Sequence, residues 1–176
     1  MKLERHAAAL SFAAAAVFVA MTVLEFLYFR RIGDGAPSLD LRFAGSSPED
    51  AMSWLNSLGP RGRESVIVWH YLTFDLVFPS LAALALASII LALGRGAPRF
   101  PQMRRQAYIV AAALCAPAAL ADYAQNVAVA RLLMDPLNAT PDSIAVASAL
   151  VVAKFVAYVP PLGAIAFLWS SSRRGG

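Results

Sequence analysis

Five ionisable side chains fall inside long apolar stretches of this sequence. Asp75, Asp122 and Lys154 each lie near the middle of a different stretch, whereas Glu25 and His70 lie closer to an end. Ionisable residues at membrane depth usually face the protein interior, pair with one another, and mark ion, proton or ligand sites. Two carboxyls and one amine therefore suit a structural ion-pair network, a polar binding pocket, a proton relay or an acid/base pair.

Other polar side chains extend the same helical faces. Gln125 and Asn126 follow Asp122 by three and four residues, so the three form one polar stripe on a helix. A tyrosine also lies one helical turn from each of two charged residues on the neighbouring stretches. The residues that we predict to form a binding pocket or intramembrane network, with no catalytic role, are Asp75, Asp122, Lys154, Asn126, Gln125, Tyr71, Tyr158, Glu25 and His70.

Two features of the second stretch bear on its geometry. Pro79 has no N–H to donate to the carbonyl of Asp75, four residues earlier, so the sequence predicts a free acceptor beside that carboxylate. His70 precedes Asp75 by five residues. In an α-helix this spacing separates two side chains by about 140°. We therefore do not expect His70 and Asp75 to share a site.

The composition identifies the elements that must position these groups. Apolar residues make up 59% of the 176 residues and charged residues only 15%, against about 25% in soluble domains. A membrane span requires about 20 apolar helical residues, and four stretches meet this requirement. We predict an all-α membrane protein, a four-transmembrane-helix bundle that forms a single domain over residues 1–176, with spans at about 7–29, 66–93, 107–133 and 144–169.

The longest connection, residues 30–65, is expected to be ordered and non-cytoplasmic. Residues 39–43 alternate apolar and polar side chains, which predicts an extended segment with one apolar face. Ser47 opens a short amphipathic helix, and Gly59 with the following proline ends it. This loop either folds over the mouth of the bundle or lies on the lipid headgroups as an interfacial helix.

The deep charges share one level if alternate spans run in opposite directions. Counted from the non-cytoplasmic face, Asp75, Asp122 and Lys154 lie about 14–16 Å deep, close to the bilayer midplane, and Glu25 and His70 at about 6 Å. Lys154 is expected to neutralise one of the two aspartates. The remaining carboxyl must then be protonated, hydrated or matched by another cation.

Basic residues near the span ends predict cytoplasmic termini, because cytoplasmic loops carry an excess of Lys and Arg. One side holds eight such residues and the other six. The alanine-rich composition is typical of bacteria, so the expected location is the bacterial cytoplasmic (inner) membrane. The eight basic residues on the predicted cytoplasmic side are Lys2, Arg5, Arg95, Arg99, Arg104, Arg105, Arg173 and Arg174.

Several classes of site are excluded. Cys115 is the only cysteine, which rules out a disulfide framework, a CxxC redox pair and a cysteine zinc site within one chain. His6 and His70 are the only histidines, too few for a histidine-rich metal centre. The sequence contains no GxSxG, HExxH or glycine-rich phosphate motif. We therefore predict no metal and no cofactor. No nucleic-acid partner is expected, because the arginines flank apolar runs.

Two short motifs carry a resemblance to a known group. They are Asp75-Leu76-Val77-Phe78-Pro79 and Asp122-Tyr123-Ala124-Gln125-Asn126, preceded by the segment 58–63. The arrangement resembles a group of small uncharacterised bacterial integral membrane proteins with four spans, with Asp-x-x-Phe-Pro in the second span and Asp-x-x-Glu-Asn in the third. Gln125 stands here at the glutamate position. The resemblance covers roughly residues 40–130 and implies a four-span fold and no settled activity.

Three functions are compatible with these observations. The leading one is a non-catalytic integral membrane protein whose buried layer of Asp75, Asp122 and Lys154 forms a structural network or a small polar pocket for a lipid or small molecule. The first alternative is a proton-coupled small-solute transporter. Because the chain has no evident internal repeat, a carrier would require a homodimer. The second alternative is a lipid-modifying membrane enzyme with Asp75 and Asp122 as its acid/base pair.

Overall fold

The computed structural model describes residues 3–96 and 101–173, with side chains described except at 95, 96 and 101–105. In this part of the chain every regular element is a helix. Three of the basic residues that predict the orientation, Lys2, Arg99 and Arg174, lie outside the described residues.

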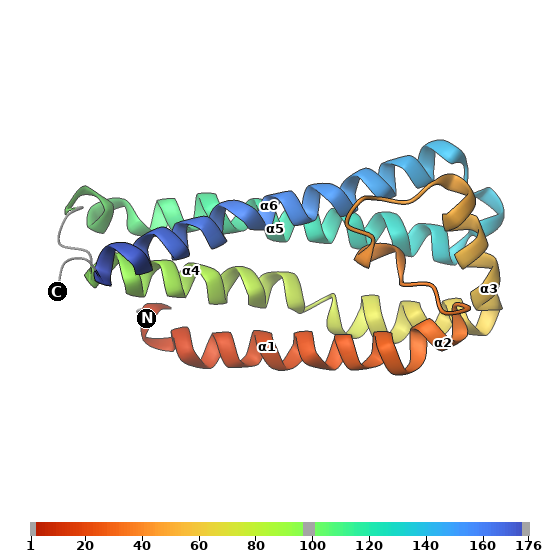
Figure 1. Cartoon of the computed structure of the whole chain (residues 1–176), viewed down its shortest axis with the longest axis horizontal. Helices are drawn as coiled ribbons and strands as arrows, with labels where there is room; N and C mark the ends of the chain where they lie inside the picture. Colours follow the sequence, from red (N-terminus) through yellow and green to blue (C-terminus); the bar gives the residue numbers. More distant parts are fainter. Residues whose placement is uncertain (1–2, 97–100, 174–176) are drawn as a thin grey trace.

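Four helical stretches are long and apolar enough to cross a membrane, which confirms the predicted all-α, four-helix class. They run side by side, and the start of the first and the end of the last lie at the same end of the bundle (Figure 1). The stretches are Leu3–Ile32, Pro48–Gly94, Gln106–Met134 and Pro141–Arg173. Their main α-helices are α1 (Ala7–Leu24), α4 (Phe78–Gly96), α5 (Pro101–Met134) and α6 (Pro141–Arg173).

Helix α4 is the centre of the bundle, since it packs against α1, α5 and α6. Small side chains are buried on both α4 and α5: Ala82 and Ala85 on the former, and Ala111, Cys115 and Ala118 on the latter. Small residues let helix backbones approach closely in a membrane, where no hydrophobic effect drives them together. Helix α1 packs mainly on α4 and has few contacts with α6 at most, so the bundle has an open side between α1 and α6.

The predicted amphipathic helix is present as the first part of α3 (Pro48–Val66). Its N-cap is Ser47, whose Oγ accepts a hydrogen bond from the backbone N–H of Asp50 at 3.1 Å. The chain bends at Gly59, where φ is +61°, a conformation that glycine adopts without a Cβ clash. Gly59 thus ends the amphipathic part of α3, as predicted, and the helix beyond the kink leads into the second membrane-spanning stretch.

The apolar face of α3 is buried against the bundle end. Trp54 and Leu55 are 2% and 0% exposed, and both belong to an apolar core that also contains Phe29 and Val129. Helix α3 contacts both α5 and α6. The loop therefore folds over the end of the bundle instead of lying apart on the headgroups.

The first two membrane-spanning stretches each contain a π-helical segment, η2 (Glu25–Phe29) and η4 (Ile67–Phe74). In a π-helix the backbone bonds join residues five apart, as in the 2.8 Å bond from Asp75 N–H to the His70 carbonyl. Residues 75–77 then form a turn before α4 begins at Phe78. The break is visible between the yellow and green parts of the chain in Figure 1.

The prediction of an extended segment at residues 39–43 is wrong, because Leu39–Leu41 forms a 3₁₀ turn. The preceding Ser38 is fixed by Glu25, whose carboxylate accepts hydrogen bonds from the Ser38 N–H at 3.0 Å and from its hydroxyl at 2.6 Å. Alternating polarity thus marks a turn that buries both Leu39 and Asp40, and the loop enters the bundle mouth.

Leu55→Ala should destabilise the docked loop by about 2–5 kcal/mol, because it opens a cavity in a fully buried contact. Unfolding of the detergent-solubilised protein measures the change in stability, and limited proteolysis reports whether residues 33–58 are released. Asn56→Ala, at the neighbouring exposed position, is the matched control and should behave as wild type. Equal behaviour of the two variants would contradict the docking of α3.

Candidate functional site

Five of the buried ionisable residues fall into two groups. Asp40, His70 and Asp75 make the first, called here the Asp–His–Asp cluster. The second, called the lysine cluster, comprises Lys154, Asp122, Gln125 and Tyr158. The predicted single layer is therefore divided, with Asp75 and Asp122 in separate clusters.

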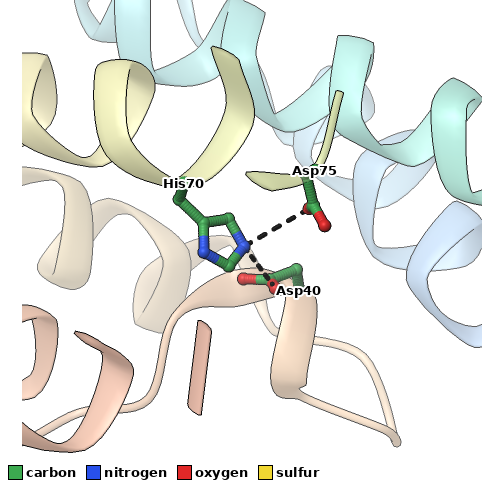
Figure 2. A group of neighbouring side chains, drawn as sticks. All are labelled: Asp40, His70 and Asp75. Atoms are coloured by element: carbon green, nitrogen blue, oxygen red, sulfur yellow. Dashed lines mark hydrogen bonds and ion pairs between the residues drawn. The ribbon is translucent and has the colours of Figure 1, made fainter. Parts of the chain in front are cut away.

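In the Asp–His–Asp cluster one ring nitrogen faces two carboxylates. Nε2 of His70 lies 3.0 Å from Oδ2 of Asp40 and 3.3 Å from Oδ2 of Asp75. All three side chains are at most 3% exposed. Figure 2 shows that the imidazole points its Nε2 between carboxylates that approach from different elements. An imidazole nitrogen carries one proton, so it can donate fully to only one of them.

The expectation that His70 and Asp75 do not share a site is wrong, and the π-helix is the reason. The angular estimate assumed α-helical geometry over the five residues between them. The π-helical segment η4 places residues five apart one turn from each other, so both side chains face the same way. π-Helical segments frequently occur at functional sites, and this one brings together two of the three residues of the cluster.

Sequence reasoning missed Asp40, which the alternating pattern placed on a polar face. Asp40 is 2% exposed and contacts His70, thirty residues later. Burial alone would raise the pKa of the Asp40 carboxyl, but the positive charge of His70 and its hydrogen bond, with a smaller effect of Lys154, lower that pKa to about 2. The available signal was an acid between two leucines, Leu39 and Leu41, in a loop otherwise predicted to pack on the bundle.

The predicted free acceptor at Asp75 is confirmed. Its backbone carbonyl accepts a hydrogen bond from Nδ2 of Asn126 at 3.2 Å, across from α5. The next carbonyl, that of Leu76, accepts one from the hydroxyl of Tyr123 at 2.9 Å. Asn126 and the unpredicted Tyr123 thus satisfy backbone groups that the break before Pro79 leaves without helical partners.

In the lysine cluster Lys154 neutralises Asp122, one of the two partners expected for it. Nζ of Lys154 lies 3.3 Å from Oδ1 of Asp122 and donates to Oε1 of Gln125 at 2.7 Å. The hydroxyl of Tyr158 donates to Oδ2 of Asp122 at 3.1 Å. Residues from α5 and α6 are thereby joined.

Two further predicted site residues have other surroundings. Glu25 is 1% exposed and binds the loop through Ser38, with Nε of Arg30 at 3.4 Å from its carboxylate. Its position explains how the loop is held. Tyr71 is buried in the apolar core, and its ring packs edge-on against His70 with centroids 4.9 Å apart.

A cavity of about 510 Å³ connects both clusters. It lies on the open side of the bundle between α1 and α6, and its lining contains both polar and apolar residues. The charged and polar lining residues are Thr22, Glu25, Arg30, Asp40, His70, Asp75, Asp122, Lys154 and Tyr158; the apolar ones are Phe18, Met21, Phe26, Leu41, Phe43, Phe78 and Phe155.

No family model, curated protein or solved structure matches this sequence. The resemblance to four-span bacterial proteins therefore remains a prediction. What the chain does has to be argued from the geometry of the two clusters and the cavity between them.

Lys154→Met should destabilise the protein by about 3–5 kcal/mol, because it leaves the Asp122 carboxylate buried without its cation. The double variant Lys154→Met/Asp122→Asn should lose less than the single variant, since no charge is stranded. Denaturant unfolding of the purified protein in one detergent compares the three proteins. A Lys154→Met variant as stable as wild type, or a double variant less stable than the single one, would show that the pair is not the source of the stability.

Proposed function

We propose that this chain is a non-catalytic integral membrane protein that binds an amphiphilic, lipid-like molecule in the cavity between α1 and α6, called here the cleft. The observation that carries the proposal is that both apolar and charged side chains line the cleft. One part of the lining is aromatic and aliphatic, and the other holds the buried charges of both clusters. Few small solutes match both kinds of surface, whereas a headgroup with an attached acyl chain does.

The apolar part suits the chain of such a ligand. Phe18 and Phe26 on the first membrane-spanning stretch are each 55% exposed, and Phe43 in the loop is 68% exposed. Phe18 packs on Phe78 with ring centroids 6.0 Å apart, and Phe43 on Phe155 at 4.6 Å. In a bilayer these rings face hydrocarbon, so an acyl chain can enter from the side and remain partly in the lipid.

The charged part suits the headgroup. The ammonium of Lys154 and the guanidinium of Arg30 have N–H groups left to donate to phosphate or carboxylate oxygens. The volume of about 510 Å³ lies within the range of about 300–1,000 Å³ that is usual for ligand pockets. That space holds a headgroup and the first part of a chain.

The site is proposed to open toward the non-cytoplasmic side of a bacterial cytoplasmic membrane. Both ends of the described chain lie at the opposite end of the bundle from the loop (Figure 1). The excess of basic residues near those ends supports cytoplasmic termini. The resemblance to small four-span bacterial membrane proteins agrees with this location and adds no activity.

A proton-coupled carrier is the second candidate, favoured by the turn at residues 75–77 beside the cleft. Interrupted helices at membrane depth line the substrate sites of many carriers. The catalytic alternative has less support, because the two carboxylates of its acid/base pair are held in separate clusters, Asp75 by His70 and Asp122 by Lys154. Solute-dependent proton uptake into proteoliposomes would favour the carrier.

Thr22→Trp should abolish binding, because Thr22 lines the cleft and the much larger indole would occupy part of its volume. Native mass spectrometry of protein extracted gently from its own membrane measures the fraction that carries a lipid-sized adduct. Val23→Trp is the matched control, since Val23 is 48% exposed and is not among the residues that line the cleft. We expect the adduct on wild type and Val23→Trp and its loss from Thr22→Trp.

Bare wild-type protein that is still folded would refute amphiphile binding. An adduct of equal abundance on Thr22→Trp would place the ligand elsewhere on the molecule. The mass of the adduct identifies the headgroup class.

A further inference from the structure

The geometry points to a divalent metal-ion site formed by Asp40, His70 and Asp75. Its ligands would be one imidazole nitrogen and two carboxylate oxygens, a set suited to a first-row ion such as Zn²⁺ or Mn²⁺. This inference goes beyond the binding of an amphiphile and does not depend on it.

The three donor atoms already converge as ligands do. Metal–ligand bonds of about 2.0–2.2 Å at tetrahedral or octahedral angles hold adjacent donor atoms ~3.0–3.5 Å apart. The two separations from Nε2 of His70 are 3.0 Å to Asp40 and 3.3 Å to Asp75. One donor atom can be taken from each residue so that the three atoms all lie within 4.8 Å of one another. A small shift of one carboxylate would let the three donor atoms bind one ion.

The cluster has unmet bonding capacity. Oδ1 of Asp40 has no hydrogen-bond partner among the described residues, and Oδ2 of Asp75 has none besides its 3.3 Å approach to Nε2 of His70, although each residue is 2% exposed. Burying an unsatisfied polar atom is costly, and natural proteins usually avoid it. The two carboxylates approach one nitrogen, whose single proton can bond to only one of them. A metal ion in the place of that proton could bind both.

The charges around the cleft also call for a cation. Four carboxylates line it, from Glu25, Asp40, Asp75 and Asp122, against two permanent cations, Lys154 and Arg30. With a neutral histidine, as a metal ligand must be, the lining carries two uncompensated negative charges. A protonated His70 would cancel one of them, and a divalent ion would cancel both.

The site has an entry path and open positions. All three residues line the cleft, so an ion can reach them without unfolding the bundle. Three protein ligands leave at least one coordination position free, as in metal sites that bind a further ligand. If the amphiphile proposal also holds, that position faces the part of the cleft assigned to the headgroup.

The ion would fix the loop as well as bind there. Asp40 belongs to the loop, whereas His70 and Asp75 belong to the second membrane-spanning stretch. Coordination would join two segments that are distant in the sequence. The thermal stability of the protein should therefore rise when the metal is added.

The test uses full-length, tag-free protein in detergent, stripped with chelator and titrated with Co²⁺ while its visible absorption is followed, with Zn²⁺ as competitor. We expect wild type to bind one equivalent, and Asp40→Asn, His70→Gln and Asp75→Asn each to weaken binding at least ~100-fold, more than loss of an outer-shell partner usually does. Asp142→Asn is the control, because Asp142 is exposed in the first turn of α6 and does not line the cleft. It should bind Co²⁺ nearly as wild type does.

Two measurements keep the outcome decisive if a variant fails to fold. Size-exclusion chromatography and circular dichroism identify such a variant. X-ray absorption at the zinc edge of the wild-type complex should show one imidazole nitrogen among oxygen ligands. Absence of saturable binding by folded wild type, a zinc shell without imidazole, or binding retained in His70→Gln would each overturn the site. No lipid is added, so this result and the adduct experiment can fail separately.

Discussion

One imidazole held between two buried aspartates is the contact on which the rest of this structure depends. Asp40 reaches His70 only because the loop turns into the bundle mouth, and Asp75 reaches it only because the second span is π-helical and then breaks. Each departure from regular structure is costly in an apolar environment. Both are accounted for by the need to give buried carboxylates a partner. Through these two departures from regular structure, both carboxylates reach the same imidazole.

Much of the architecture could be predicted because membrane burial imposes simple rules. The length of the apolar runs predicted four helices, Pro79 predicted the free carbonyl of Asp75, and the level of Asp122 and Lys154 predicted their proximity. The remainder depended on backbone geometry that side-chain patterns do not encode. A change from α- to π-helical hydrogen bonding reverses the relation of His70 to Asp75 without changing a single residue. Asp40 was missed because a short turn and an extended strand can share the same alternation of polarity.

The two clusters differ in their balance of charge and in the segments that they join. The lysine cluster is internally balanced, with Lys154 against Asp122, and it joins α5 to α6 as a fixed support. The Asp–His–Asp cluster is acidic and under-bonded, and it joins a loop to a span. The cleft is therefore lined by one cluster whose charges are paired and by another in which two aspartates share one histidine. The apolar rings that also line the cleft are the reason that we propose an amphiphile as its ligand.

The coupling between Asp40 and His70 tests this account most directly, because it reports whether the loop carboxylate meets the π-helical imidazole. A double-mutant cycle with Asp40→Asn and His70→Gln, followed by unfolding of chelator-treated protein in detergent, gives the interaction free energy. The account predicts a coupling of about 1–3 kcal/mol, as is usual for residues in one buried network. Effects that add to within about 0.5 kcal/mol would show that the two residues do not interact, and the proposed organisation of the site would be wrong.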